Sequence, residues 1–153
     1  MVRTVVAMMF AAMVGTAALA QGPLPSVSVK EAHQQASDGK MVIVDIRTPG
    51  EWAETGTPQG AVRLDMTERD FPTKLATLQK QIGDKAVGII CRTANRTSYV
   101  QEVLTRHGFK LINIRGGMAG NPGNPGWIAS GLPVDKIRGC PRSITDLGSL
   151  DAA

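Results

Sequence analysis

The sequence of 153 residues is poor in aromatic side chains, in histidine and in cysteine. Only 4% of its residues are Phe, Trp or Tyr, and no stripe alternates basic with aromatic residues, so the stacking platforms of a nucleic-acid-binding protein are missing. With two histidines and two cysteines, no group of His, Cys, Asp or Glu has the spacing of a metal site. We therefore expect no nucleic-acid partner and no metal.

Long apolar runs are also missing except near the N-terminus, where residues 5–19 are uncharged and mostly apolar after Arg3. These fifteen or so residues are fewer than the roughly twenty that span a membrane. The run ends at Ala18-Leu19-Ala20, the small-x-small pattern of a signal-peptidase site. We predict a signal peptide over 1–20, with an uncleaved membrane anchor as the alternative. The mature protein would then be periplasmic or secreted, with no stable membrane insertion.

The rest of the chain is long enough for one domain with its own core. We predict a linker over 21–26, a domain over 27–135 and a C-terminal tail over 136–153. The formal net charge of +4 becomes +3 without Arg3, because residues 1–20 hold no acidic side chain. A small positive excess favours a small anionic substrate. Four arginines fall near predicted strand ends, where the mouth of a site would lie: Arg47, Arg92, Arg96 and Arg115.

Strand and helix patterns alternate along the predicted domain. Strands are predicted over 41–46, an apolar run broken only by Asp45 and typical of a strand buried on both faces, over the apolar segment 86–90, and over 110–114. Helices are predicted over 28–37, from Pro49 onward, over 70–82 and over 98–108. This alternation predicts an α/β fold, with a central, mainly parallel sheet and helices on both faces. Ligands of such sheets bind at the carboxyl ends of the strands, where Asp45, Cys91 and Arg115 fall.

A cysteine lies in the short loop between the strand predicted at 86–90 and the following helix. Backbone N–H groups and the helix dipole in such a loop stabilise an anion or a thiolate. Arg92 and Arg96 add positive charge, and Thr97 is expected to cap the helix. These features favour Cys91 as a nucleophile acting on an anionic substrate. The alternative is a small core residue at a strand end.

The loop Cys91-Arg92-Thr93-Ala94-Asn95-Arg96-Thr97 resembles the active-site loop of rhodanese-type sulfurtransferases, Cys-Arg-x-Gly-x-Arg-Ser/Thr. Segments 42–52 and 56–62 are similar to two other stretches of that family. The pair 116–118 and 127–134 resembles its closing segment, split here by an insertion at 119–126. Ala94 replaces the usual glycine. If that position needs a left-handed backbone, alanine costs about 1–2 kcal/mol, whereas the neighbouring Asn95 tolerates it better.

The resemblance implies a rhodanese-like protein of the single-domain, exported type. Cys91 would take a sulfane sulfur from a small anionic donor such as thiosulfate, hold it as a persulfide, and pass it to a thiol or to cyanide. No cofactor is needed, since the cysteine carries the group. Arg96 would brace the loop. Asp45 and Arg47 would support it through hydrogen bonds to its backbone or to Arg96, or form a structural ion pair instead. The residues expected to bind substrate are Arg92, Thr93, Ala94, Asn95, Arg96 and Thr97.

The length of the loop disfavours a phosphatase, and two other functions stay open. Cysteine phosphatases place five residues between cysteine and arginine, whereas four separate Cys91 from Arg96, which makes a smaller cradle. A redox or arsenate-reducing enzyme would use Cys91 together with Cys140, the second cysteine, and the two could also form a disulfide. A module that binds sulfur or a protein without catalysis is the other alternative. The insertion at 119–126 either borders the pocket or is a passive surface turn.

Overall fold

The computed structural model describes residues 22–136. The predicted signal peptide, nearly all of the predicted tail and Cys140 lie outside the described residues. In the part of the chain that is described, no helix has the length and apolar character needed to cross a membrane.

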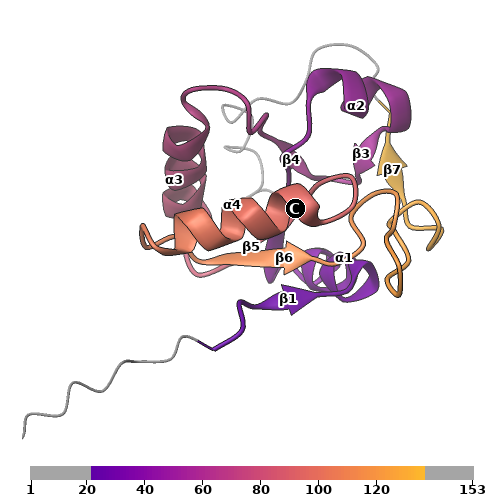
Figure 1. Ribbon diagram of the computed structural model, residues 1–153, viewed down its shortest axis with the longest axis horizontal. Coiled ribbons are helices and arrows are strands. Elements are labelled where there is room, and N and C mark those ends of the chain that lie inside the picture. Colours follow the sequence, from indigo (N-terminus) through magenta and orange to yellow (C-terminus); the bar gives the residue numbers. More distant parts are fainter. Residues whose placement is uncertain (1–21, 137–153) are drawn as a thin grey trace, which may run out of the picture.

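Five parallel strands form the central sheet (Figure 1). Apolar runs produce the three inner strands, at or within one residue of the predicted bounds. Both edge strands have only two residues, and β1 begins at the last residue of the predicted linker. In spatial order the strands are β1 (Ser26–Val27), β6 (Leu111–Ile114), β5 (Ala86–Ile90), β2 (Met41–Asp45) and β4 (Val62–Arg63).

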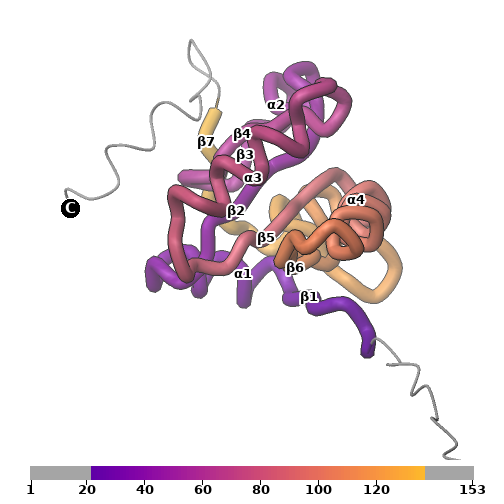
Figure 2. The backbone as a smooth tube through the Cα atoms, turned by 90° about the vertical axis from the view of Figure 1, so that its left-hand side faces the viewer, coloured from indigo at the N-terminus to yellow at the C-terminus, as the bar shows by residue number. Residues whose placement is uncertain are grey.

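Helices cover both faces of this sheet, as Figure 2 shows with α1 and α4 on opposite sides. Alternate strand residues point to the two cores: Val44 and Ile89 belong to the core under α3 and α4, whereas Ile43 and Ile90 pack with α1. Burial on both faces explains why these strands are mostly apolar. The predicted α/β fold is therefore confirmed. The helices are α1 (Val29–Ser37), α2 (Pro49–Thr55), α3 (Phe71–Gln81) and α4 (Asn95–Thr105).

A local signal sets the start of α1. The Ser28 hydroxyl accepts from the Glu31 amide at 3.2 Å, and the Glu31 carboxylate accepts from the Ser28 amide at 2.7 Å, so the capping box of α1 is confirmed. Helix α4 begins at Asn95, three residues before the predicted start. The cysteine loop therefore runs directly into the helix.

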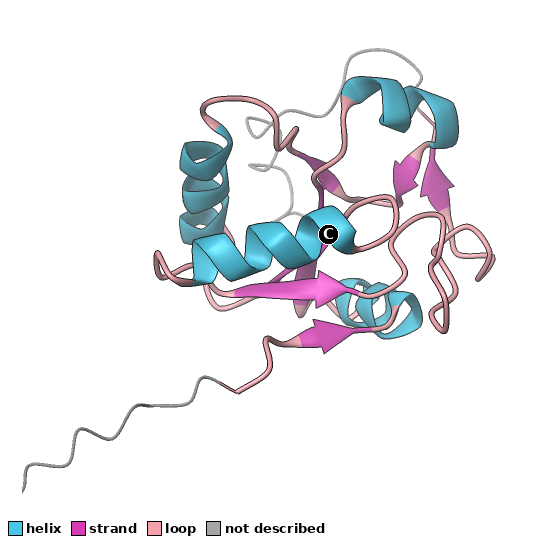
Figure 3. Ribbon diagram, viewed as in Figure 1, coloured by secondary structure: helices cyan, strands magenta, loops and turns pink. Residues whose placement is uncertain are grey.

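A second, two-stranded antiparallel sheet pairs β3 (Thr57–Pro58) with β7 (Val134–Asp135), as Figure 3 shows at the right. The close approach of the two strands requires Gly56, whose φ is +76° and whose added Cβ would lie 2.8 Å from the Asp135 carbonyl oxygen. Neither two-residue strand carries a periodic pattern, so the sequence predicts neither of them.

Candidate active site

Cys91 directly follows β5 at the carboxyl edge of the parallel sheet, and its side chain has no exposed surface. Asp45 ends the neighbouring strand β2 in register with Ile90, and Arg115 follows β6 on the other side. The edge predicted to hold the site therefore does collect these residues, because parallel strands end together.

The carbonyl groups at the start of the cysteine loop are all bonded to one neighbouring segment. The Met118 and Ala119 amides donate to the carbonyl oxygens of Cys91 and Arg92, each at 2.8 Å. The Asn121 side-chain amide donates to the Thr93 carbonyl, also at 2.8 Å. The N–H groups of 92–97, in contrast, make no hydrogen bond to any residue in the range 22–136. Free N–H groups at a helix N-terminus form a cradle for an anion.

A glycine lets the segment 116–121 pack this closely on the loop. Gly117 has φ +60°, and a Cβ there would lie 2.5 Å from the Cys91 carbonyl oxygen and 2.7 Å from that of Arg92. The insertion also takes part in the site: Asn124 donates to the Asn121 side-chain oxygen at 3.0 Å and orients the amide that binds Thr93. Of the two interpretations of 119–126, the structure favours the one in which it borders the site.

Ala94 adopts a left-handed backbone, with φ 69° and ψ 0°, and is the one non-glycine residue among those described to have a positive φ. This position, where the resembled loop has a glycine, therefore does need a left-handed backbone, and the alanine costs about 1–2 kcal/mol. Ala94 is also the N-cap residue of α4 and has no capping side chain. The turn of the chain at Ala94 lets the helix begin at Asn95.

The prediction that Thr97 caps α4 is wrong. Its side chain is fully buried and points under the loop. The Thr97 hydroxyl lies 3.6 Å from the Cys91 sulfur, 3.0 Å from the Ala94 carbonyl oxygen and 2.7 Å from the side-chain oxygen of Asn113 on β6. The early helix start places Thr97 in the first turn instead of at its cap.

Arg96 braces the loop through a residue that the sequence analysis did not single out. Its Nη1 and Nη2 donate to the two carboxylate oxygens of Glu51 on α2, at 2.8 and 2.5 Å. Hydrogen bonds from Arg96, followed by the Thr48 amide, lower the pKa of Glu51 to about 2 against the opposing effect of burial. The pKa of Arg96 is raised mainly by Glu51, with a smaller contribution from Cys91. The Thr48-x-x-Glu51 spacing of a capping box is the sequence signal that could have found Glu51.

Asp45 and Arg47 do not contact the loop through hydrogen bonds, which corrects their assignment as loop support. They form a buried ion pair, with Arg47 Nη2 2.6 Å from Asp45 Oδ2. Arg47 also donates to the Thr55 hydroxyl and to the Gly56 carbonyl, at 2.8 and 2.7 Å. The pair thus anchors the C-terminal end of α2. Of the two roles expected for Asp45 and Arg47, the structural ion pair is the one observed.

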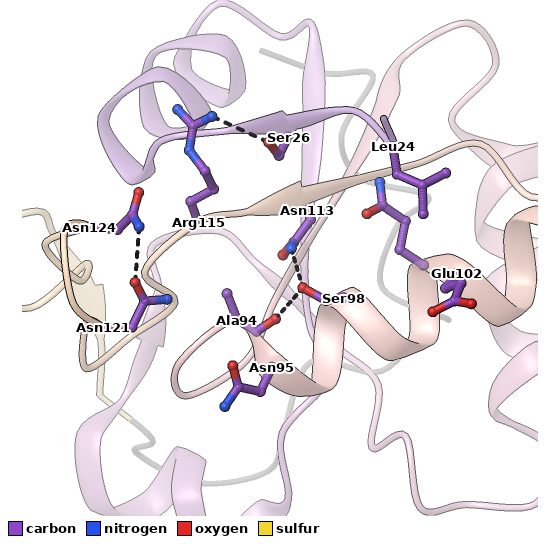
Figure 4. Close-up of a pocket in the computed structure, with 11 residues that line it drawn as sticks. Leu24, Ser26, Ala94, Asn95, Ser98, Glu102, Asn113, Arg115, Asn121 and Asn124 are labelled. Atoms are coloured by element: carbon purple, nitrogen blue, oxygen red, sulfur yellow. Dashed lines mark hydrogen bonds between the residues drawn. The ribbon is translucent and has the colours of Figure 1, made fainter. Parts of the chain in front are cut away.

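Arg92 and Asn95 are exposed beside the loop, and no ion pair or side-chain hydrogen bond holds either of them within the described range. A polar pocket of about 500 Å³ adjoins the loop on the side of α4 and β6 (Figure 4). Cys91 does not line it. Its lining includes Ser26, Ala94, Asn95, Ser98, Asn113, Arg115, Asn121 and Asn124.

A family model described as "Rhodanese-like domain" matches residues 28–120. The Bacillus subtilis protein named "Putative sulfurtransferase YtwF" is 39% identical over 82 residues, which cover 54% of this chain and 74% of that protein. A rhodanese-like domain protein from Staphylococcus aureus superimposes with a TM-score of 0.56 at 26% identity, over 74% of this chain and 100% of its own. The polysulfide-sulfur transferase of Wolinella succinogenes gives a TM-score of 0.53 at 26% identity, over 74% and 80%.

Proposed function

The chain belongs to the rhodanese-like family, and we propose that it is a sulfurtransferase in which Cys91 carries the transferred sulfur as a persulfide. One observation supports this most directly. Six consecutive N–H groups, from Arg92 to Thr97, are without protein acceptors in the described chain, and they directly follow a buried cysteine at a helix N-terminus. Such a cradle stabilises a sulfur anion attached to Cys91.

In the first half-reaction the Cys91 thiolate attacks the outer sulfur of thiosulfate. A bond forms between Sγ and that sulfur while the bond to the sulfonate sulfur breaks, and its electron pair leaves with sulfite. In the second, cyanide or a thiolate attacks the outer persulfide sulfur. Thiocyanate or a new persulfide leaves, and the Cys91 thiolate is regenerated. Each step conserves charge and needs no external oxidant or reductant, so no cofactor enters the cycle.

The geometry favours sulfur over a phosphoryl group. Both terminal nitrogens of Arg96 already donate to Glu51, so the carboxylate takes the end-on fork of the guanidinium that phosphoryl oxygens would use. With only four residues between Cys91 and Arg96, the cradle is also short. Arg92, exposed and unpaired in the described chain, is the cation available to attract the donor. Because Cys91 has no exposed surface, the donor reaches it only when neighbouring groups move.

The test is the intact mass of the reduced protein after incubation with thiosulfate. We expect a gain of one sulfur atom that cyanide removes, and no gain in Cys91→Ser. Cys140→Ser is the matched control: it should keep the gain, whereas a redox enzyme using both cysteines would lose turnover in this variant. A wild-type protein that gains no sulfur from thiosulfate or polysulfide would contradict the proposal and favour a module without catalysis.

We also propose that residues 1–20 direct export. The support is the sequence pattern of a short apolar run ending at Ala18-Leu19-Ala20. Expression of the full chain in a bacterium, followed by fractionation and N-terminal sequencing, should give a periplasmic or secreted protein that begins near Gln21. A chain that keeps its N-terminus and stays in the membrane fraction would point to the anchor instead.

A further inference from the structure

We propose that Asn113 is a positioning residue that turns the hydroxyl hydrogen of Thr97 away from the Cys91 sulfur. Asn113 lies on β6, next to β5, and is largely buried. Through Thr97 it sets how readily the thiol gives up its proton. This inference deepens the proposed function, since it concerns the cysteine taken as the nucleophile.

The side chains form one connected chain of hydrogen bonds between the buried sulfur and the wall of the polar pocket. Cys91 Sγ lies 3.6 Å from Thr97 Oγ1, which lies 2.7 Å from Asn113 Oδ1. At its other end, the Asn113 Nδ2 donates to Ser98 Oγ at 2.8 Å, and Ser98 Oγ donates to the Ala94 carbonyl at 2.8 Å (Figure 4).

The position of each hydrogen follows from the last bond in this chain. The Ser98 hydroxyl has a single hydrogen, which the Ala94 carbonyl accepts, so the Ser98 oxygen must accept from Asn113. This requirement orients the amide with its oxygen toward Thr97. The Thr97 hydrogen then points to Asn113, because the alternative acceptor, the Ala94 carbonyl, is farther away and already accepts from Ser98. Thr97 thus offers a lone pair to Cys91, which a thiol S–H can use and a thiolate cannot.

Ionisation of Cys91 therefore opposes this arrangement. A thiolate gains a hydrogen bond from Thr97 only if the Thr97 hydroxyl turns and gives up its bond of 2.7 Å to Asn113. The loop amides and Arg96 act in the opposite direction, in favour of the thiolate. The charged residues of the loop and of the neighbouring strand end are Arg92, which is exposed, Arg96, held by Glu51 of α2, and the Asp45–Arg47 pair at the end of β2. Arg115, after β6, is turned toward Ser26 and Glu31.

The experiment measures the ultraviolet absorbance of the thiolate as a function of pH, in a Cys140→Ser background where Cys91 is the remaining thiol. It contains no sulfur donor, so its outcome does not depend on whether sulfur transfer occurs. Asn113→Leu removes the acceptor at similar volume and frees the Thr97 hydrogen for the sulfur. We expect about 2- to 10-fold more thiolate at a pH below the midpoint, the factor that one hydrogen bond supplies. Asn113→Asp keeps the acceptor and adds negative charge, and should lower the thiolate fraction.

Thr97→Val separates positioning from a general structural role. If Asn113 acts through Thr97, Asn113→Leu changes the thiolate fraction in the wild-type background and not in Thr97→Val, so the two effects do not add. A structural role would lower the free energy of unfolding in both backgrounds without moving the thiolate midpoint. An unchanged midpoint in Asn113→Leu, or an equal shift of Asn113→Leu with and without the Thr97 hydroxyl, would overturn the inference. If Asn113→Leu does not fold, the smaller neutral change Asn113→Ala, compared with and without Thr97→Val, gives the same test.

Discussion

Arg96 of the cysteine loop and Glu51 of α2 form a bidentate ion pair, with each terminal guanidinium nitrogen on a different carboxylate oxygen. The two residues are 45 positions apart in the sequence. The pair joins the first turn of α4 to α2, and it engages both terminal nitrogens of the Arg96 guanidinium.

Glu51→Gln should weaken this link between α2 and the cysteine loop. We expect the free energy of unfolding to fall by about 1–2 kcal/mol, since charge-assisted hydrogen bonds are stronger than neutral ones. Sulfur transfer should fall severalfold because the loop loses its fixed position. Glu54→Gln is the matched control, since Glu54 is exposed on the same helix. Urea titrations of both variants provide the measurement, and equal losses in the two would show that the pair does not stabilise the loop.

The same pair gives stability a defined dependence on pH. Arg96 and Thr48 hold the pKa of Glu51 at about 2, below its ordinary value of 4.5. A lowered pKa means that the stabilisation is complete above about pH 4.5 and is lost as the pH falls toward 2. The difference in unfolding free energy between wild type and Glu51→Gln should therefore shrink from pH 5 to pH 2. A difference that stays constant over this range would contradict the assignment.

Ala94→Gly should stabilise the protein. Glycine removes the left-handed strain of about 1–2 kcal/mol, and its greater freedom in the unfolded chain offsets part of that gain, which leaves about 0.5–1 kcal/mol. The same substitution at Ala32, inside α1, should destabilise instead, because glycine is unfavourable in a helix and a buried methyl group is lost. Thermal unfolding of the two variants would reveal opposite signs. A loss of stability in Ala94→Gly would mean that the methyl group contributes more than the strain costs.

Arg92→Ala should weaken capture of the anionic donor without affecting the fold. Arg92 is exposed and unpaired among the residues described, so the free energy of unfolding should change by less than about 0.5 kcal/mol. We expect a severalfold rise in KM for thiosulfate and a weaker dependence of that KM on ionic strength. Arg106→Ala removes the same charge at the far end of α4 and serves as the control. Equal effects of both changes would indicate net charge alone.

The sequence by itself determined the elements that local rules govern. Apolar runs fixed the three inner strands, and the pairing of Ser28 with Glu31 fixed the start of α1. The loop that follows β5 placed Cys91 at the carboxyl edge of a parallel sheet, and the alanine at the glycine position marked where strain arises if the backbone is left-handed. These inferences succeeded because hydrophobic periodicity, capping and backbone sterics act between residues a few positions apart.

Only the tertiary structure decided which side chains meet. Asp45 and Arg47 could have bonded to the loop, yet they pair with each other, and the brace comes from Glu51. Asn113 reaches Thr97 across 16 positions, and Asn121 reaches Thr93 across 28. The two-residue strands also depend on tertiary structure, because each is defined only by its pairing with another strand. Contacts of this kind depend on how strands and helices stack in space, and no local pattern in the chain specifies them.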